Sequence, residues 1–258
     1  MKTRMLMLLA ALFLSTSALA ADVRVMISAG FYRVYSALVP AFEKATGNHV
    51  ITTRGPSMGD SPEAIPTRLA RGEPADVVIM DGASAERLAQ RGVLREGSVV
   101  RLARSQVGMV VKAGAPKPDI GSVEAFKRTL LAAKSVAYSD SGSGTYLSKT
   151  LFPKLGIADQ IAGKSRKVRG PPSGEPVAAV VARGEAEIGF QQVAELIHVP
   201  GVTYVGPIPP ELQEPFFFAG GIAAKAPQPE AAAALIRHLS SPEAAPALKE
   251  AGLLPVSK

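Results

Sequence analysis

The chain has 258 residues, a formal net charge of +7 at pH 7, and neither cysteine nor tryptophan. The lack of cysteine excludes disulfides, thiolate nucleophiles and cysteine metal sites, and the three histidines do not lie at a metal-ligand spacing. The basic residues are scattered and not interleaved with aromatic ones, which favours a solvated surface that attracts small anions over a nucleic-acid interface. We therefore expect no metal, no other cofactor and no nucleic-acid partner.

The N-terminal stretch has the pattern of a secretory signal peptide. Lys2 and Arg4 supply positive charge, residues 5–14 are apolar but too short to span a bilayer, and Ala18 and Ala20 form an A-x-A cleavage signal. We expect residues 1–20 to be removed by cleavage near Ala20, and the mature protein to be a soluble protein of the periplasm.

Strands and helices then alternate, which is typical of α/β folds. The first set consists of strand 23–27, helix 32–46, strand 50–53, helix 62–71, strand 77–80 and helix 83–91. The second set consists of strand 106–112, helix 122–133, strand 135–139, helices 145–155 and 175–183, and strands 188–190 and 202–205. A proline-rich break at 207–210 precedes strand 216–224 and helices 229–240 and 242–251.

This order predicts two lobes, each a mostly parallel sheet flanked by helices. The chain crosses between them near Arg104 and near Pro207, so residues 21–104 plus 208–258 form one lobe and residues 105–207 the other. A ligand cleft between hinged lobes follows from such crossings.

Three apolar strands run into loops rich in serine, glycine and threonine that open helices, at 25–30, 50–59 and 136–145. Helix N-termini carry unpaired N–H groups and partial positive charge, so their convergence on one cleft predicts a site for a small anion.

Several motifs together resemble the periplasmic molybdate-binding proteins of ABC importers over essentially the whole mature chain. They are the stretches 25–30, 42–47, 55–59, 72–79 and 184–190. The resemblance implies the two-lobed type II periplasmic-binding-protein fold. It places the family's ligand-contacting serines on Ser28 and Ser57, further contacts near Ser143, Gly144 and Val177, and the family's tyrosine on Gln192.

The chain has Gln192 where the family has a tyrosine, and it also has Arg54 in the second loop and a dense row of hydroxyl groups in the third. These differences suit a carboxylate better than molybdate, because an arginine fork binds planar carboxylates with two hydrogen bonds. The expected substrate-binding residues are Ser28, Arg54, Ser57, Met58, Ser141, Ser143, Gly144, Thr145, Gln191 and Gln192.

The stretches 54–59, 71–80, 138–148 and 190–192 are similar to a branch of this family associated with aconitate isomerase. The similarity implies an allylic proton shift that interconverts cis- and trans-aconitate without a metal or redox cofactor. The alternative is a monomeric receptor that delivers an oxyanion or small carboxylate to an ABC permease. A monomer is expected in either case.

Proton transfer needs a general acid or base close to the reacting carbons. The sequence offers Asp140 in the third loop and Tyr32 after the first as the expected catalytic residues, with Asp60 and Tyr146 as further candidates. Each aspartate also suits a helix cap or turn, and each tyrosine suits packing between elements.

Overall fold

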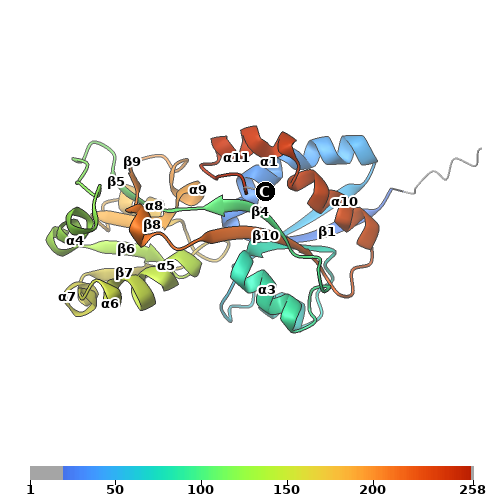
Figure 1. Cartoon of the computed structure of the whole chain (residues 1–258), viewed down its shortest axis with the longest axis horizontal. Helices are drawn as coiled ribbons and strands as arrows, with labels where there is room; N and C mark the ends of the chain where they lie inside the picture. Colours follow the sequence, from blue (N-terminus) through green and yellow to red (C-terminus); the bar gives the residue numbers. More distant parts are fainter. Residues whose placement is uncertain (1–19, 257–258) are drawn as a thin grey trace, which may run out of the picture.

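The computed structural model describes residues 20–256, so the expected signal peptide lies outside the described residues apart from Ala20. Within residues 20–256, no helix combines the length and hydrophobicity that a bilayer crossing requires. The molecule is elongated, with two lobes that each contain one five-stranded sheet flanked by helices (Figure 1).

The sheet of the first lobe has the strand order β2-β1-β3-β10-β4. Its strands are β1 (Asp22–Ile27), β2 (His49–Arg54), β3 (Val77–Asp81), β4 (Val100–Ser105) and β10 (Phe216–Ile222). The second sheet has the order β7-β6-β8-β5-β9. Its strands are β5 (Val107–Lys112), β6 (Val136–Ser139), β7 (Ser165–Val168), β8 (Ile188–Gln192) and β9 (Val202–Pro207).

The two-lobed α/β architecture is confirmed, but both sheets are mixed rather than mostly parallel. In the first, β1 pairs in parallel with β2 and β3, whereas β10 runs antiparallel to β3 and β4. In the second, β6 pairs in parallel with β7 and β8, whereas β5 runs antiparallel to β8 and β9. The antiparallel strands β5 and β10 each enter their sheet straight from the other lobe, without the crossover helix that parallel neighbours need.

Helices cover both faces of the first sheet. They are α1 (Ala29–Thr46), α10 (Pro229–Leu239) and α11 (Ala245–Glu250) on one face, and α2 (Ile65–Ala70) and α3 (Gly82–Gln90) on the other. Helix α1 illustrates how the sequence encodes this packing: Phe31, Val34, Tyr35 and Phe42 are buried at helical spacing, and the helix ends at Gly47. Gly47 adopts φ 73°, and its N–H donates to the carbonyl of Glu43, a left-handed cap that glycine favours.

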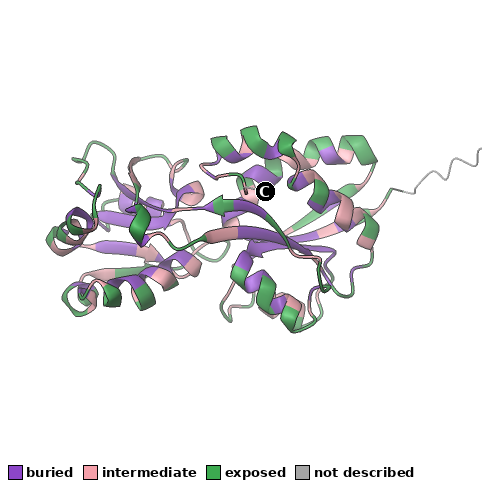
Figure 2. Cartoon of the chain, viewed as in Figure 1, coloured by how far each residue is buried: buried purple, intermediate pink, exposed green. Residues whose placement is uncertain are grey.

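The helices of the second lobe have ten residues or fewer. They are α4 (Val123–Ala132), α5 (Gly142–Tyr146), a π-helical turn (Leu147–Leu151), α6 (Phe152–Lys154), α7 (Ala158–Ala162), α8 (Val177–Ala182) and α9 (Val193–Leu196). Two apolar clusters, one around Phe126 and Phe190 and one around Val180 and Val110, fill the two faces of its sheet. Figure 2 shows the strands of both lobes mostly buried and the outer sides of the helices exposed.

The sequence patterns do not predict β4, α7, β7 or α9. The helix expected at 62–71 begins only at Ile65, because Ala64 is extended and Pro66, which needs no N–H partner, lies in the first helical turn. The helix expected at 145–155 begins earlier, at Gly142, and passes through the π-helical turn.

A fully buried carboxylate joins three segments of the first lobe. The side chain of Asp76, just before β3, accepts hydrogen bonds from the N–H of Arg24 in β1 (2.8 Å) and from the N–H of Gln228 before α10 (2.6 Å). The carbonyl of Asp76 accepts from the N–H of Ala223 after β10 (3.0 Å). Asp76 therefore fixes where β10 leaves the sheet and α10 begins.

We predict that Asp76→Ala lowers the free energy of unfolding by about 3 kcal/mol, because two backbone N–H groups lose a charged acceptor. Urea unfolding followed by circular dichroism measures the change. Asp22→Ala, which removes an exposed carboxylate from β1, is the matched control and should cost less than about 0.5 kcal/mol. Equal stabilities of the two variants would contradict the role of Asp76.

Candidate functional site

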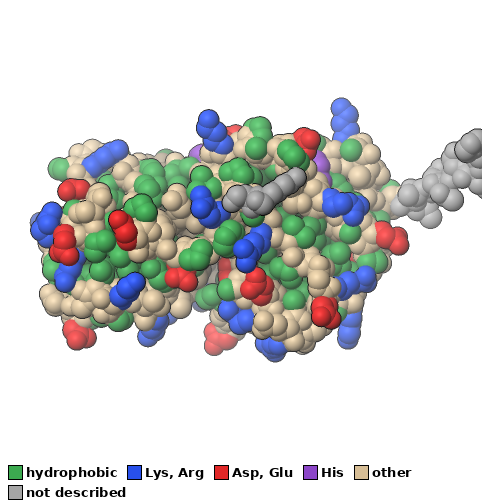
Figure 3. Space-filling model, viewed as in Figure 1, with side chains coloured by type: hydrophobic (Ala, Val, Ile, Leu, Met, Phe, Trp, Pro, Cys, Tyr) green, Lys and Arg blue, Asp and Glu red, His purple; other side chains and the backbone are tan. Residues whose placement is uncertain are grey.

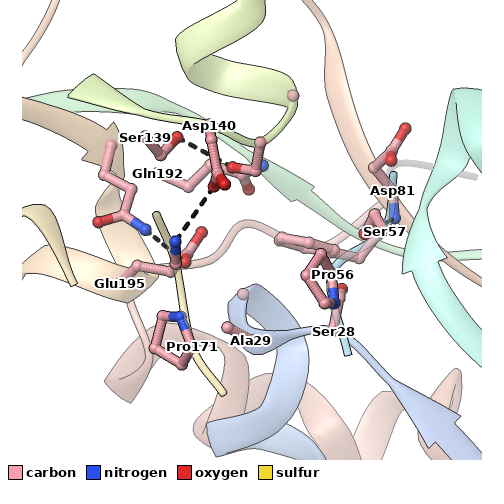
Figure 4. A pocket seen from close by; sticks show the side chains of 16 residues that line it. Ser28, Ala29, Pro56, Ser57, Asp81, Ser139, Asp140, Pro171, Gln192 and Glu195 are labelled. Atoms are coloured by element: carbon pink, nitrogen blue, oxygen red, sulfur yellow. Dashed lines mark hydrogen bonds between the residues drawn. The ribbon is translucent and has the colours of Figure 1, made fainter. Parts of the chain in front are cut away.

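The carboxyl ends of β1 and β3 in the first lobe face those of β6 and β8 in the second across a cavity (Figure 4). The cavity is partly open to solvent. Its lining residues are Ser28, Ala29, Gly30, Pro56, Ser57, Asp81 and Phe218 from the first lobe and Ser139, Asp140, Ser141, Gly142, Gly170, Pro171, Gln191, Gln192 and Glu195 from the second.

The first loop brings the N-terminus of α1 to the cavity. Ser28 is the N-cap residue, but its side chain caps no backbone N–H, and its buried Oγ has no hydrogen-bond partner within residues 20–256. Gly30 allows the helix to start this close to β10, because a Cβ there would lie 2.1 Å from the ring of Phe218. The hydroxyl of Ser28 and the N–H groups of the first turn are therefore available to a ligand.

The second loop reaches the cavity through Pro56 and Ser57. The Oγ of Ser57 accepts a hydrogen bond from the N–H of Asp81 (3.1 Å), which leaves the hydroxyl proton of Ser57 for a ligand. Asp81 caps α3 through one carboxylate oxygen, which accepts from the N–H of Ser84 (2.9 Å), while its buried Oδ2 has no partner among the described residues. The N-terminus of α2, which the loop pattern predicts at this site, does not line the cavity, because the helix starts several residues later at Ile65.

The third loop packs its hydroxyl groups against one another at the end of β6. The Oγ of Ser139 lies 2.9 Å from that of Ser141 and 3.2 Å from that of Ser143. Gly144 permits this turn, since a Cβ there would lie 1.7 Å from the carbonyl oxygen of Ser139. Ser139 and Ser141 line the cavity, whereas Ser143 and Gly144 are buried behind it.

Asp140 and Gln192 line the second-lobe wall. The Oδ1 of Asp140 accepts a hydrogen bond from the N–H of Gly170 (3.1 Å), which ties the third loop to the segment after β7. Gln192 is 4% exposed, and its Oε1 has no partner within residues 20–256. A ligand with a protonated or N–H group, or a water held by the ligand, would satisfy this oxygen.

Glu195 in α9 completes that wall. The Oε1 of Gln191 accepts from the N–H of Val177 at the start of α8 (3.0 Å), and the Nε2 of Gln191 donates to the Oε2 of Glu195 (2.6 Å). Burial raises the pKa of Glu195 from its ordinary 4.5 to about 7, and the charge of Asp140 adds to this increase. The hydrogen bond from Gln191 and the charge of Arg54 act in the opposite direction.

Besides Ser143 and Gly144, four more of the expected site residues lie outside the lining: Tyr32, Arg54, Met58 and Thr145. The guanidinium of Arg54 stacks over the ring of Tyr32, 4.3 Å from its centroid, and is close enough to affect the pKa of Glu195. Met58 and Thr145 line a neighbouring hollow, which shares Asp81 and Gly142 with the cavity.

Ser28, Ser57, Asp140, Ser141, Gln191 and Gln192 do come together in the lining. Sequence reasoning missed Asp81 and Glu195. Asp81 could have been found because an aspartate at the end of an apolar strand, three residues before Ser84, fits a helix cap. Glu195 could have been found because it lies four residues after Gln191, a spacing at which side chains on a helix interact.

Comparisons with known proteins identify relatives over the whole described chain. Residues 23–254 match a family model described as bacterial extracellular solute-binding protein. An aconitate isomerase from Pseudomonas sp. is 47% identical over 251 residues, which cover 96% of this chain and 94% of that relative. The molybdate-binding protein ModA of Azotobacter vinelandii is 30% identical over 258 residues, covering 97% of this chain and 96% of the relative. The solved A. vinelandii periplasmic molybdate-binding protein superposes with a TM-score of 0.71 at 22% identity, covering 91% of this chain and all of that one (100%).

We predict that Glu195 makes the ligand-free protein less stable as the pH rises. Its pKa is higher in the folded state than its ordinary 4.5, so the folded state binds the proton more tightly and stability falls between about pH 4.5 and pH 7. Glu195→Gln should remove this decline, so that its free energy of unfolding, relative to the wild type, increases by about 2 kcal/mol from pH 5 to pH 8.

Urea unfolding across this pH range measures the difference. Glu230→Gln, at an exposed position of α10, is the control and should leave the wild-type pH dependence unchanged. The same pH dependence in Glu195→Gln and the wild type would contradict the raised pKa.

Proposed function

The chain belongs to the family of bacterial extracellular solute-binding proteins, and we propose that it uses the cleft of this fold to interconvert cis- and trans-aconitate. The observation that carries the proposal is the 47% identity to an aconitate isomerase over 96% of this chain. The relative named for molybdate binding matches the chain at 30% identity.

The chemistry of the cavity supports an enzyme. Hydroxyl groups, an amide and the first turn of α1 offer neutral donors to an anion, whereas the carboxyl groups of Asp140 and Glu195 lie in the same lining. A receptor for a fully ionised oxyanion gains nothing from carboxyl groups at its ligand, because like charges repel. A proton-transfer enzyme requires such a group.

The proposed reaction is an allylic proton shift. A base removes a proton from the CH₂ carbon of the tricarboxylate, and the electron pair of that C–H bond forms the new C=C bond. The electron pair of the former C=C bond takes up a proton at its far carbon. The substrate and the product are isomers, so no oxidant, reductant or other reactant is consumed.

We assign the binding of the substrate carboxylates to Ser28 and Ser57 from the first lobe and to Ser141 and Gln192 from the second. Arg54 lies behind this set and contributes positive charge at longer range. Asp140 lies in the lining and is a candidate for proton transfer, whereas Tyr32 is stacked under Arg54 outside it.

We place the reaction in the periplasm, after cleavage of the signal peptide near Ala20, and expect a monomer. On the face drawn in Figure 3, Lys and Arg side chains are spread among Asp and Glu over both lobes. This distribution fits a freely diffusing protein that takes up a small anion rather than one that binds a polyanion.

We predict that the purified protein, incubated with trans-aconitate in D₂O, produces cis-aconitate, and that the deuterium content at the carbon that gains the proton reports how far the proton carrier exchanges with solvent during the transfer. ¹H NMR follows both changes in one sample, and heat-denatured protein is the control for spontaneous isomerisation. Tight binding of molybdate or tungstate without turnover of aconitate would contradict the enzyme and support the receptor alternative.

We further predict that Ser28→Ala weakens binding of trans-aconitate by about tenfold, the effect of one lost hydrogen bond to a charged ligand, without lowering the stability of the protein. The Oγ of Ser28 caps no N–H group and has no partner within the described chain, so its removal costs the fold nothing. Isothermal titration calorimetry and urea unfolding measure the two properties.

Ser122→Ala is the matched control, because Ser122 caps α4 by accepting from the N–H of Ala125 (3.2 Å). It should lower the free energy of unfolding by about 1 kcal/mol and leave binding unchanged. Unchanged binding in Ser28→Ala would remove Ser28 from the ligand site.

A further inference from the structure

Glu195 occupies a distinctive place in the cavity. Strand β8 ends at Gln192, and the single turn of α9 brings the chain back over the end of the strand. Figure 4 shows the carboxyl group of Glu195 between Asp140 and Pro171, on the second-lobe side, facing the first-lobe residues Ser28 and Ser57 across the cavity. A ligand held by the two serines would therefore be exposed to this carboxyl group.

A chain of two hydrogen bonds orients that carboxyl group. The backbone N–H of Val177 fixes the amide oxygen of Gln191, so the NH₂ group of Gln191 must point toward Glu195. The Oε2 of Glu195 accepts from this NH₂ group in both protonation states. Its Oε1 has no hydrogen-bond partner within residues 20–256, so the titrating proton resides on the oxygen that is free to meet a ligand.

The electrostatic surroundings suit a group that both takes and returns a proton. Burial, assisted by Asp140 from the loop after β6, brings the pKa of Glu195 to about 7, while Gln191 from β8 and Arg54 from β2 limit the increase. From α1, the ring of Tyr32 lies under the guanidinium of Arg54. Both protonation states of Glu195 are therefore populated near neutral pH, which is the condition for efficient general acid–base catalysis.

We propose that Glu195 is the catalytic residue that moves the proton between the two ends of the allylic system, and that Gln191 is its positioning residue. The proposal rests on the isomerase function above. Ionised Glu195 takes the proton from the CH₂ carbon, and the C–H electron pair becomes the new C=C bond. The protonated carboxyl group then gives a proton to the far carbon of the former C=C bond and returns to the ionised state. The two carbons are separated by one atom, so a single carboxyl group can reach both from one face.

The other candidates are less suited to this step. Asp140 and Asp81 each hold a backbone N–H group in place, that of Gly170 and that of Ser84, so moving either carboxyl group toward a substrate would release part of the fold, whereas the partner of Glu195 is a side-chain amide. Tyr32 lies outside the lining of the cavity and is covered by Arg54. Glu195 combines an oxygen without a partner among residues 20–256, an orientation set by Gln191 and a pKa of about 7.

The test compares wild type, Glu195→Gln, Asp140→Asn and the exposed control Glu230→Gln with trans-aconitate as the substrate. Binding is measured by calorimetry and turnover by NMR. The glutamine keeps an oxygen to accept from Gln191 but cannot take up a proton. We expect Glu195→Gln to bind trans-aconitate within a few-fold of wild type and to lose kcat by a factor of about 10² to 10⁴. Glu230→Gln should match the wild type.

The outcomes separate this proposal from the proposed function. An active wild type with a Glu195→Gln variant within tenfold of it would overturn the assignment of Glu195 and leave the isomerase intact. A larger loss of kcat in Asp140→Asn than in Glu195→Gln would transfer the role to Asp140. An inactive wild type would overturn the isomerase function and the assignment together.

Gln191→Met tests the positioning role with a readout that a structural role would not change. Removal of the hydrogen bond that lowers the pKa of Glu195 should move the acid limb of the pH profile of kcat/KM to higher pH. An unchanged limb, with kcat/KM lowered equally at all pH values, would assign Gln191 a structural role only.

Discussion

Buried polar atoms without partners at the ends of the strands are the constraint from which the organisation of this protein follows. Ser28, Asp81 and Gln192 each present such an atom to the cavity. Leaving one unpaired costs on the order of 1–3 kcal/mol, which the apolar clusters behind the cleft must offset. Each lobe has an apolar core that can offset this cost, one around Phe31 and the other around Phe190. A ligand that forms hydrogen bonds with these atoms removes this cost and increases the stability of the folded protein.

The same cavity holds three carboxyl groups, those of Asp81, Asp140 and Glu195, although its other features favour an anion. Asp81 and Asp140 are used to hold backbone N–H groups at the start of α3 and after β7. Glu195 differs because its partner is a side-chain amide rather than a backbone N–H group. An anion bound beside it stabilises its protonated form and so makes the carboxylate more basic in the complex. Greater basicity is what removal of a weakly acidic C–H proton requires, so the repulsion that a receptor would avoid becomes useful to an isomerase.

The sequence predicts the elements that are apolar on a regular period and misses those that are not. Helix α1 has buried residues at a helical spacing and strand β3 is a short run of buried residues, and the bounds of both differ little from those expected. Strands β4 and β7 lie at the edges of their sheets, where exposed arginine and lysine side chains obscure the alternation of a strand. The loops of the site were predicted because serine and glycine mark the turns after buried strands. The position of Glu195 was not, because it depends on a single helical turn that brings a residue back over the strand it follows.

An anion-binding protein of this fold therefore needs few changes to become an enzyme that isomerises its ligand. Hydroxyl groups and N–H donors from Ser28, Ser57 and Ser141 can bind the carboxylates of the substrate. The same donors can stabilise the negative charge that spreads onto these carboxylates from the allylic system during the reaction. Only the interactions that strengthen during this spreading accelerate the reaction, and donors already fixed by the ends of two rigid sheets need no rearrangement to provide them. The hydroxyl and N–H donors cannot act as a proton acceptor at the carbon atoms. Glu195 in α9 supplies this proton acceptor, and it is oriented by the amide of Gln191, which the N–H of Val177 holds in place. Because Glu195 lies in the lobe opposite Ser28 and Ser57, the substrate must lie between these donors and the base before the proton can move.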